Sequence, residues 1–101
     1  MILEILKKRW KLVFQEKPKL EGEECLGYCE RPDQKGKRIV IDCNVTGTEL
    51  LEVLIHEQTH AADWSKDEEW VEDYADDLAK NLVRIINNYP EKFYDGEGNF
   101  K

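Results

Sequence analysis

The chain has 101 residues, of which 41% are hydrophobic and 37% are charged, and its formal net charge is −7. This length is typical of one domain, and the apolar fraction is too high for an intrinsically disordered chain. No apolar run approaches the ~20 residues of a membrane span, and the first basic residues follow an apolar run, the wrong order for a signal peptide. We therefore expect residues 1–101 to form a single cytoplasmic domain without a membrane partner, with a core at about residues 10–88 and a tail at 89–101.

The charge is unevenly distributed along the chain. Residues 1–47 carry 10 basic and 8 acidic side chains, whereas residues 48–101 carry 5 basic and 14 acidic ones. Residues 48–101 are acidic enough to repel the phosphate backbones of nucleic acids, which argues against a nucleic-acid partner. The cysteines are Cys25, Cys29 and Cys43, and their odd number and spacing fit neither a disulfide framework nor a zinc ribbon. We expect them to be reduced thiols without a metal role.

The first half of the chain reads mainly as strands. The apolar spacing of residues 1–9 indicates a short helix, and the alternation at 10–14 a strand. Residues 16–24 read as a polar loop, 28–30 as a short strand and 31–37 as a turn. The β-branched segment Arg38–Asp42 is the strongest strand prediction.

Two helices follow. The first begins in Thr46–Glu49 and runs to about Trp64. The second helix begins at one of two caps. Either Ser65 caps it and Glu68 completes a capping box, or Asp67 caps it. The helix ends at Asn87 or Asn88. Its predicted buried face consists of Val71, Tyr74, Ala75, Leu78, Leu82, Ile85 and Ile86. The expected fold is thus α+β, a short antiparallel sheet followed by two antiparallel helices.

The first helix carries an H-E-x-x-H motif at residues 56–60. His56 and His60 lie one turn apart on one helix face, so both imidazoles can reach one metal ion. Glu57 projects about 100° further round and can face a metal-bound water without binding the metal. Random placement of two histidines with this glutamate content would give the pattern in roughly 0.3% of chains.

A catalytic zinc ion needs a third protein ligand, and the chain has no third histidine. Glu68 extends the apolar stripe of the second helix at the end nearest the motif, which favours it as the ligand. Glu69 remains the alternative, because Glu69 and Asp73 match the Glu-x-x-x-Asp pattern of thermolysin-like gluzincins. Glu72 and Asp63 are candidates to orient a ligand, although Asp63 could equally face solvent.

Residues 27–83 resemble a family of small SprT-like zinc metallopeptidases from bacteria and their phages. The resemblance is carried by Gly27-Tyr28-Cys29 with Pro32, by residues 37–41, by residues 51–61, and by residues 68–71 with Ala75 and Leu78. The resemblance implies a minimal zincin fold. Members of the family have a glutamate three residues before a valine on the second helix, which implies that Glu68 is the third metal ligand. Larger SprT-like proteins carry zinc-ribbon or DNA-binding regions, which this chain lacks.

The predicted function is zinc-dependent hydrolysis of a peptide or protein substrate, with Zn²⁺ held by His56, His60 and Glu68. Glu57 would act as general base on a metal-activated water. Tyr74, Tyr89 or Tyr94 could supply an additional donor, and residues 38–42 could pair with extended substrate. Two other hypotheses remain open: a non-catalytic zinc-binding module, and an acidic interaction protein such as a nucleic-acid mimic.

Overall fold

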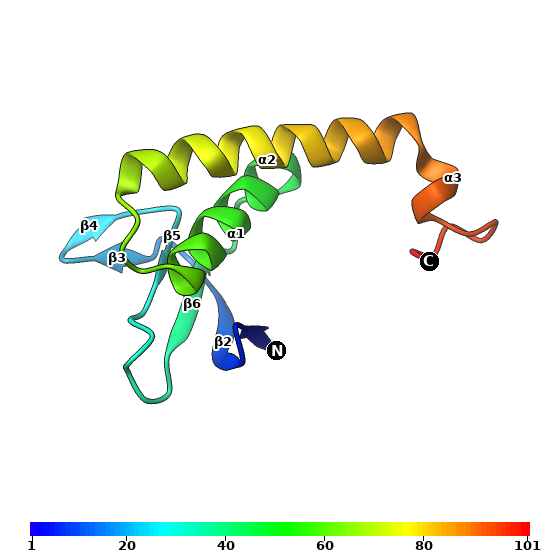
Figure 1. Cartoon of the computed structure of the whole chain (residues 1–101). Coiled ribbons are helices and arrows are strands. Elements are labelled where there is room, and N and C mark those ends of the chain that lie inside the picture. The colour runs from blue at the N-terminus through cyan, green and yellow to red at the C-terminus, as the bar shows by residue number, and fades with distance from the viewer.

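The computed structural model describes residues 1–101, which form six strands and three helices (Figure 1). The predicted α+β class is confirmed. No helix combines the length and the apolar character needed to cross a membrane. The elements are β1 (Ile2–Ile5), β2 (Lys8–Gln15), β3 (Lys19–Leu20), β4 (Glu23–Glu24), β5 (Gly27–Cys29), β6 (Arg38–Asp42), α1 (Gly47–Ala62), α2 (Glu68–Asn88) and α3 (Pro90–Phe93).

Four strands form one sheet in the order β1-β2-β6-β5. The pair β5–β6 is antiparallel, as predicted, and so is β1–β2, but β2 and β6 run parallel. The expectation of an entirely antiparallel sheet is therefore wrong for the central pair. A parallel pair requires a long connection, and residues 16–37 provide it. The predicted bounds of β6 are confirmed, and this strand lies inside the sheet with both of its edges paired.

The predicted helix at residues 1–9 is wrong, because this segment forms a β-hairpin from β1 into β2. Leu3 and Ile5 pack against the core while the residues between and beside them are exposed, which is the two-residue period of a strand. Leu6 and Lys7 make the turn with φ values of 49° and 65°. Two consecutive positive φ values suit the right-handed twist of a hairpin. The predicted loop at 16–24 likewise contains a small hairpin, β3–β4.

The main core lies between the sheet and α1, with Trp10, Ile39 and Ile41 of the sheet fully buried. Gly27 of β5 lets the helix approach closely. A Cβ atom there would lie 3.0 Å from both Val53 Cγ1 and the Val40 carbonyl oxygen, so a larger residue would push α1 off the sheet. The helix ends at Ala62, two residues before the predicted end.

The second helix begins where Asp67 caps it, accepting a hydrogen bond from the backbone N–H of Trp70 at 2.8 Å. The alternative cap, Ser65, instead donates from its hydroxyl to Asp63. The helix ends at Asn88, as predicted. These caps hold the connection between α1 and α2 to five residues, so the first turn of α2 returns over the end of α1 (Figure 1).

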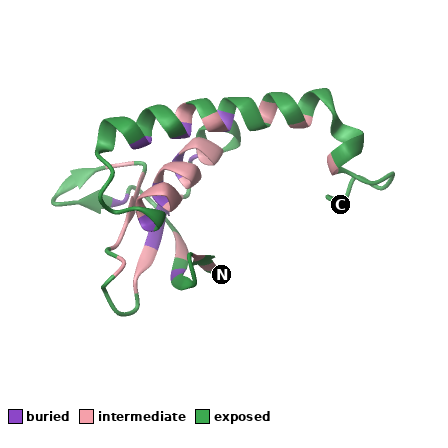
Figure 2. Cartoon of the chain, in the orientation of Figure 1, coloured by how far each residue is buried: buried purple, intermediate pink, exposed green.

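The predicted buried face of α2 is confirmed only in part. Val71 and Ala75 are buried, and so is Ala79, which was not predicted. The prediction is wrong for Tyr74, Leu82 and Ile85, which are 45%, 36% and 45% exposed. With a rise of 1.5 Å per residue, α2 is about 8 Å longer than α1, so its C-terminal part runs past its partner (Figure 2). We call residues 80–101 the arm. Its end folds back on itself, with Phe100 packed on Phe93 and Tyr94, far from the motif helix (Figure 1).

Candidate metal centre

Two neighbouring stripes of α1 side chains form the base of the site. Val53, Glu57 and Ala61, four residues apart, are buried against the sheet. His56 and His60 lie on the next stripe round the helix. Because Glu57 shares the core-facing stripe, the protein encloses its side chain, while the two imidazoles remain accessible to α2.

The two histidines converge through the same ring atom. Nε2 of His56 lies 3.2 Å from Nε2 of His60, and the side chains are 18% and 15% exposed. The ring centroids are 4.9 Å apart with a 65° angle between the planes. Both imidazoles thus direct one potential ligand atom to a common point, as their helical spacing predicts.

Glu68, the first residue of α2, completes the cluster. Its Oε1 lies 2.6 Å from Nε2 of His56, and its Oε2 lies 2.9 Å from Nε2 of His60. The Asp67 cap fixes the start of α2 at the point where Glu68 reaches across to α1. The side chain is 70% exposed, so the cluster is open to solvent on the α2 side.

The donor set fits a divalent metal ion. The ligand atoms of His56, His60 and Glu68 all lie within 4.8 Å of one another. Two ligands bound at ~2.0–2.1 Å in a tetrahedron stand ~3.3 Å apart, close to the 3.2 Å between the two imidazole nitrogens. The shorter distances to Glu68 are those of hydrogen bonds. A bound metal ion would take the place of the protons in these hydrogen bonds, so the Glu68 carboxylate would have to move outward by a few tenths of an ångström.

Glu57 is the one buried acidic side chain, with 6% of its surface exposed. Burial raises its pKa to about 8, and the nearby Glu68 carboxylate adds to the shift. No hydrogen bond or ion pair stabilises its charged form. A carboxyl group held this way is poised to exchange a proton near neutral pH, which is the property required of a general base or acid.

The other acidic candidates do not join the cluster. Glu69 contributes no ligand atom to it, although it follows Glu68 directly. Asp63 lies in the loop and accepts hydrogen bonds from the backbone and hydroxyl of Ser65, so it shapes the connection between the helices. Glu72 borders the site without a hydrogen bond to either histidine.

Two hollows open beside the cluster, and His56, Glu57, Glu68 and Gly27 line both. Sequence reasoning missed several of the other lining residues. Glu52 lies on the same helix stripe as the histidines, four residues before His56, and Trp64 follows His60 by four residues, just past the end of α1. Extending the motif by one helical turn in each direction would have found both.

The predicted tyrosines do not line either hollow. Tyr74 stacks on Trp70 at 5.1 Å between ring centroids, and Tyr89 and Tyr94 belong to the arm. Tyr28 of β5 borders the larger hollow instead. Its hydroxyl lies 3.5 Å from the Arg38 guanidinium, a long contact.

The prediction that residues 38–42 pair with substrate is wrong, because β6 lies between β2 and β5 and has no free edge. The free edge beside the cluster belongs to β5. Leu26 accepts a hydrogen bond from Asp42, and Glu30 donates one to Arg38. Because backbone groups alternate in direction, those of Gly27 and Cys29 face away from β6, and no strand pairs with them.

We compared the chain with known proteins. No protein-family description, no curated protein and no solved structure matches it significantly. The resemblance to SprT-like metallopeptidases thus stays a prediction from the motif and its surroundings, and the functional argument depends on the geometry of the site.

Proposed function

We propose that this chain is a zinc-dependent peptidase of the minimal zincin type, SprT-like in its motif and cytoplasmic. The observation that carries the proposal is the position of Glu57. An unpaired, buried carboxyl group lies directly beside a cluster of two imidazoles and a carboxylate that can hold a metal ion. Zinc, when bound there, supplies a Lewis acid that acidifies water and polarises a carbonyl group.

Each residue has a distinct task in this proposal. His56, His60 and Glu68 hold the ion. Glu57 accepts a proton from the attacking water and passes it to the leaving amine, so that one carboxyl group serves first as base and then as acid. Its raised pKa strengthens Glu57 as the base in the first transfer, because burial stabilises the protonated form that this transfer produces.

The free edge of β5 supports a peptide as the substrate. The outward backbone groups of Gly27 and Cys29 can pair with an extended chain by β-augmentation. Such a chain would pass the hollows that His56 and Glu57 line, which brings a peptide carbonyl close to the cluster.

The test is hydrolysis of an unfolded protein substrate by the full chain, with and without zinc. We expect activity that requires zinc and that falls by a factor of about 10² or more in Glu57→Gln, because a positioned base contributes that much. Glu69→Gln is the matched control and should retain activity. Hydrolysis that persists unchanged in Glu57→Gln would contradict the proposal.

One observation favours a non-catalytic alternative. The three ligand residues come from two helices, so a bound metal would join α1 to α2 and stabilise the hairpin without any chemistry. In that case zinc would bind and raise the melting temperature, while neither the chain nor Glu57→Gln would hydrolyse any peptide.

A further inference from the structure

The two hollows beside the metal cluster differ in chemical character. The smaller, of about 270 Å³, is lined by Glu52, Glu57, Glu68 and Glu72, and we call it the acidic hollow. The larger, of about 470 Å³, is lined by Leu20, Tyr28, Trp64 and Lys66, among others, and we call it the aromatic hollow. His56 lines both hollows; the acidic hollow extends from it toward Glu52, and the aromatic hollow extends past His60 to Trp64.

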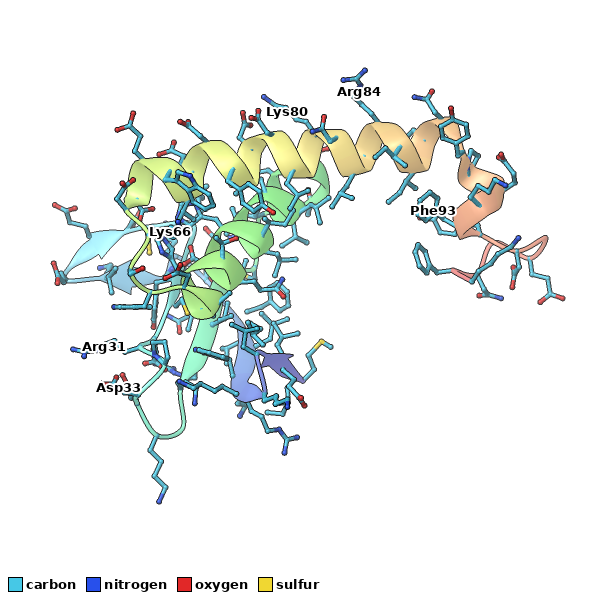
Figure 3. The ribbon with its side chains drawn as sticks, viewed as in Figure 1. Arg31, Asp33, Lys66, Lys80, Arg84 and Phe93 are labelled. Carbon is cyan, nitrogen blue, oxygen red and sulfur yellow. The ribbon has the colours of Figure 1, made fainter.

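The acidic hollow contains no basic side chain to balance its carboxylates. Neither Glu52 nor Glu72 takes part in an ion pair. The basic residue nearest along α2, Lys80, extends above the helix in Figure 3 and donates to Asp76 at 3.0 Å, so its weaker attraction to Glu52 is shared with a closer carboxylate. With Glu57 protonated, the carboxylates of Glu52, Glu68 and Glu72 carry three formal negative charges, of which a divalent metal on the cluster would cancel two. The hollow would therefore keep a negative charge in the metal-bound protein.

A second observation shows that the hollow is built to face a ligand. Glu57 has 6% of its surface exposed and no hydrogen bond within the protein. No side-chain oxygen is both sealed from solvent and without a partner, so the Glu57 carboxyl group opens into the hollow that it lines, where an entering molecule can meet it. The walls at Leu26, Gly27 and Val53 provide apolar contact for an aliphatic stem.

The aromatic hollow shares Glu57 and Glu68 with the acidic hollow, but its other walls favour an apolar side chain. Its single basic residue, Lys66, has its ammonium group over the Trp70 ring, 4.8 Å from the ring centroid. Leu20, Tyr28 and Trp64 offer a surface that suits a large apolar side chain. An extended peptide along β5 would thus meet a negative hollow on one side of the cluster and an apolar one on the other.

We propose that the substrates are basic, apolar peptide segments, in which a lysine or arginine occupies the acidic hollow and a large apolar side chain occupies the aromatic hollow. This inference rests on the proposed peptidase function. Glu52 and Glu72 determine the specificity for the basic side chain, since neither belongs to the metal cluster and neither forms an ion pair. Attraction of a cation by two carboxylates is worth about tenfold in kcat/KM at low salt.

The experiment compares matched peptides that carry lysine or glutamine at each position around one cleavage site. The zinc-loaded full chain should cleave the lysine peptide about tenfold faster in kcat/KM at one fixed position, and 0.5 M NaCl should reduce this ratio. The double variant Glu52→Gln/Glu72→Gln should bring the ratio near one. The control variant Glu49→Gln/Glu69→Gln removes the same two charges from exposed sites outside the hollow and should leave the ratio unchanged.

Cleavage without a preference for lysine, or a preference that survives in the double variant, would overturn the inference while leaving the peptidase proposal intact. Absence of cleavage of every peptide would count against the peptidase. Binding of a fluorescent lysine peptide to the zinc-loaded chain then tests the hollow directly. Affinity that drops about tenfold in the double variant would support it, and equal affinity for the lysine and glutamine peptides would refute it.

Discussion

The carboxylate of Glu68 and the imidazole of His56 lie 2.6 Å apart, although they belong to different helices. With His60 they form a bridge between the end of α1 and the start of α2. A metal bound by all three residues would tie these segments together. Metal binding and folding stability should therefore be linked.

Zinc should raise the melting temperature of the metal-free protein. At a free concentration 100-fold above its Kd, zinc adds ~2.7 kcal/mol, which corresponds to a rise of roughly 10–20 °C for a domain of this size. Differential scanning fluorimetry would measure it. His56→Ala should lose most of the rise, and an equal rise in that variant would show that zinc binds elsewhere.

The stability of the metal-free protein should fall as pH rises through neutrality. Burial raises the pKa of Glu57 from 4.5 to about 8, so the folded state holds a proton that the unfolded state has released. The contribution of Glu57 is complete below pH 4.5 and is lost progressively up to about pH 8. Urea unfolding at pH 5 and pH 8 with a chelator should show a loss of a few kcal/mol more for the native chain than for Glu57→Gln. Identical losses would mean that Glu57 is not buried in solution.

Gly27 should be intolerant of any side chain. A Cβ atom would lie 3.0 Å from Val53 Cγ1 and from the Val40 carbonyl oxygen, so Gly27→Ala would push α1 away from β5 and cost about 1–3 kcal/mol. Gly96→Ala is the control, because no atom lies within 4 Å of the added methyl group. Chemical denaturation would compare the two. Equal stabilities would contradict the close packing of helix on strand.

The two halves of α2 should differ in their response to substitution. Val71 is fully buried, so Val71→Ala should cost about 1–3 kcal/mol. Leu82 is 36% exposed on the arm, so Leu82→Ala should change the free energy of unfolding by less than about 0.5–1 kcal/mol. A larger loss at Leu82 would mean that the arm packs against another part of the chain in solution.

The accuracy of the sequence predictions depends on how local each signal is. Both long helices were predicted within two residues at their C-terminal ends, because caps act within a few residues. The convergence of His56 and His60 also follows from one helical turn. Glu68 was found because a short connection and an apolar stripe constrain the first turn of the next helix.

Features that depend on which strands and helices pack against one another were mispredicted. Ile2, Leu3 and Leu6 fit a helical spacing, but Leu3 and Ile5 also fit a strand, and pairing with β2 decides the outcome. The sequence cannot indicate that β6 is central, because that depends on which strands flank it. The apolar stripe of α2 likewise continues to Ile85, but α1 is too short to cover it.

The most direct test of the account is the number of zinc ions bound per chain, measured by native mass spectrometry after zinc loading and desalting. We predict one zinc ion for the native chain and for Glu69→Gln, and loss or strong weakening of binding in both His60→Ala and Glu68→Ala. A native chain that binds no zinc, or a Glu68→Ala variant that binds it as tightly as the native chain, would contradict the proposed metal centre.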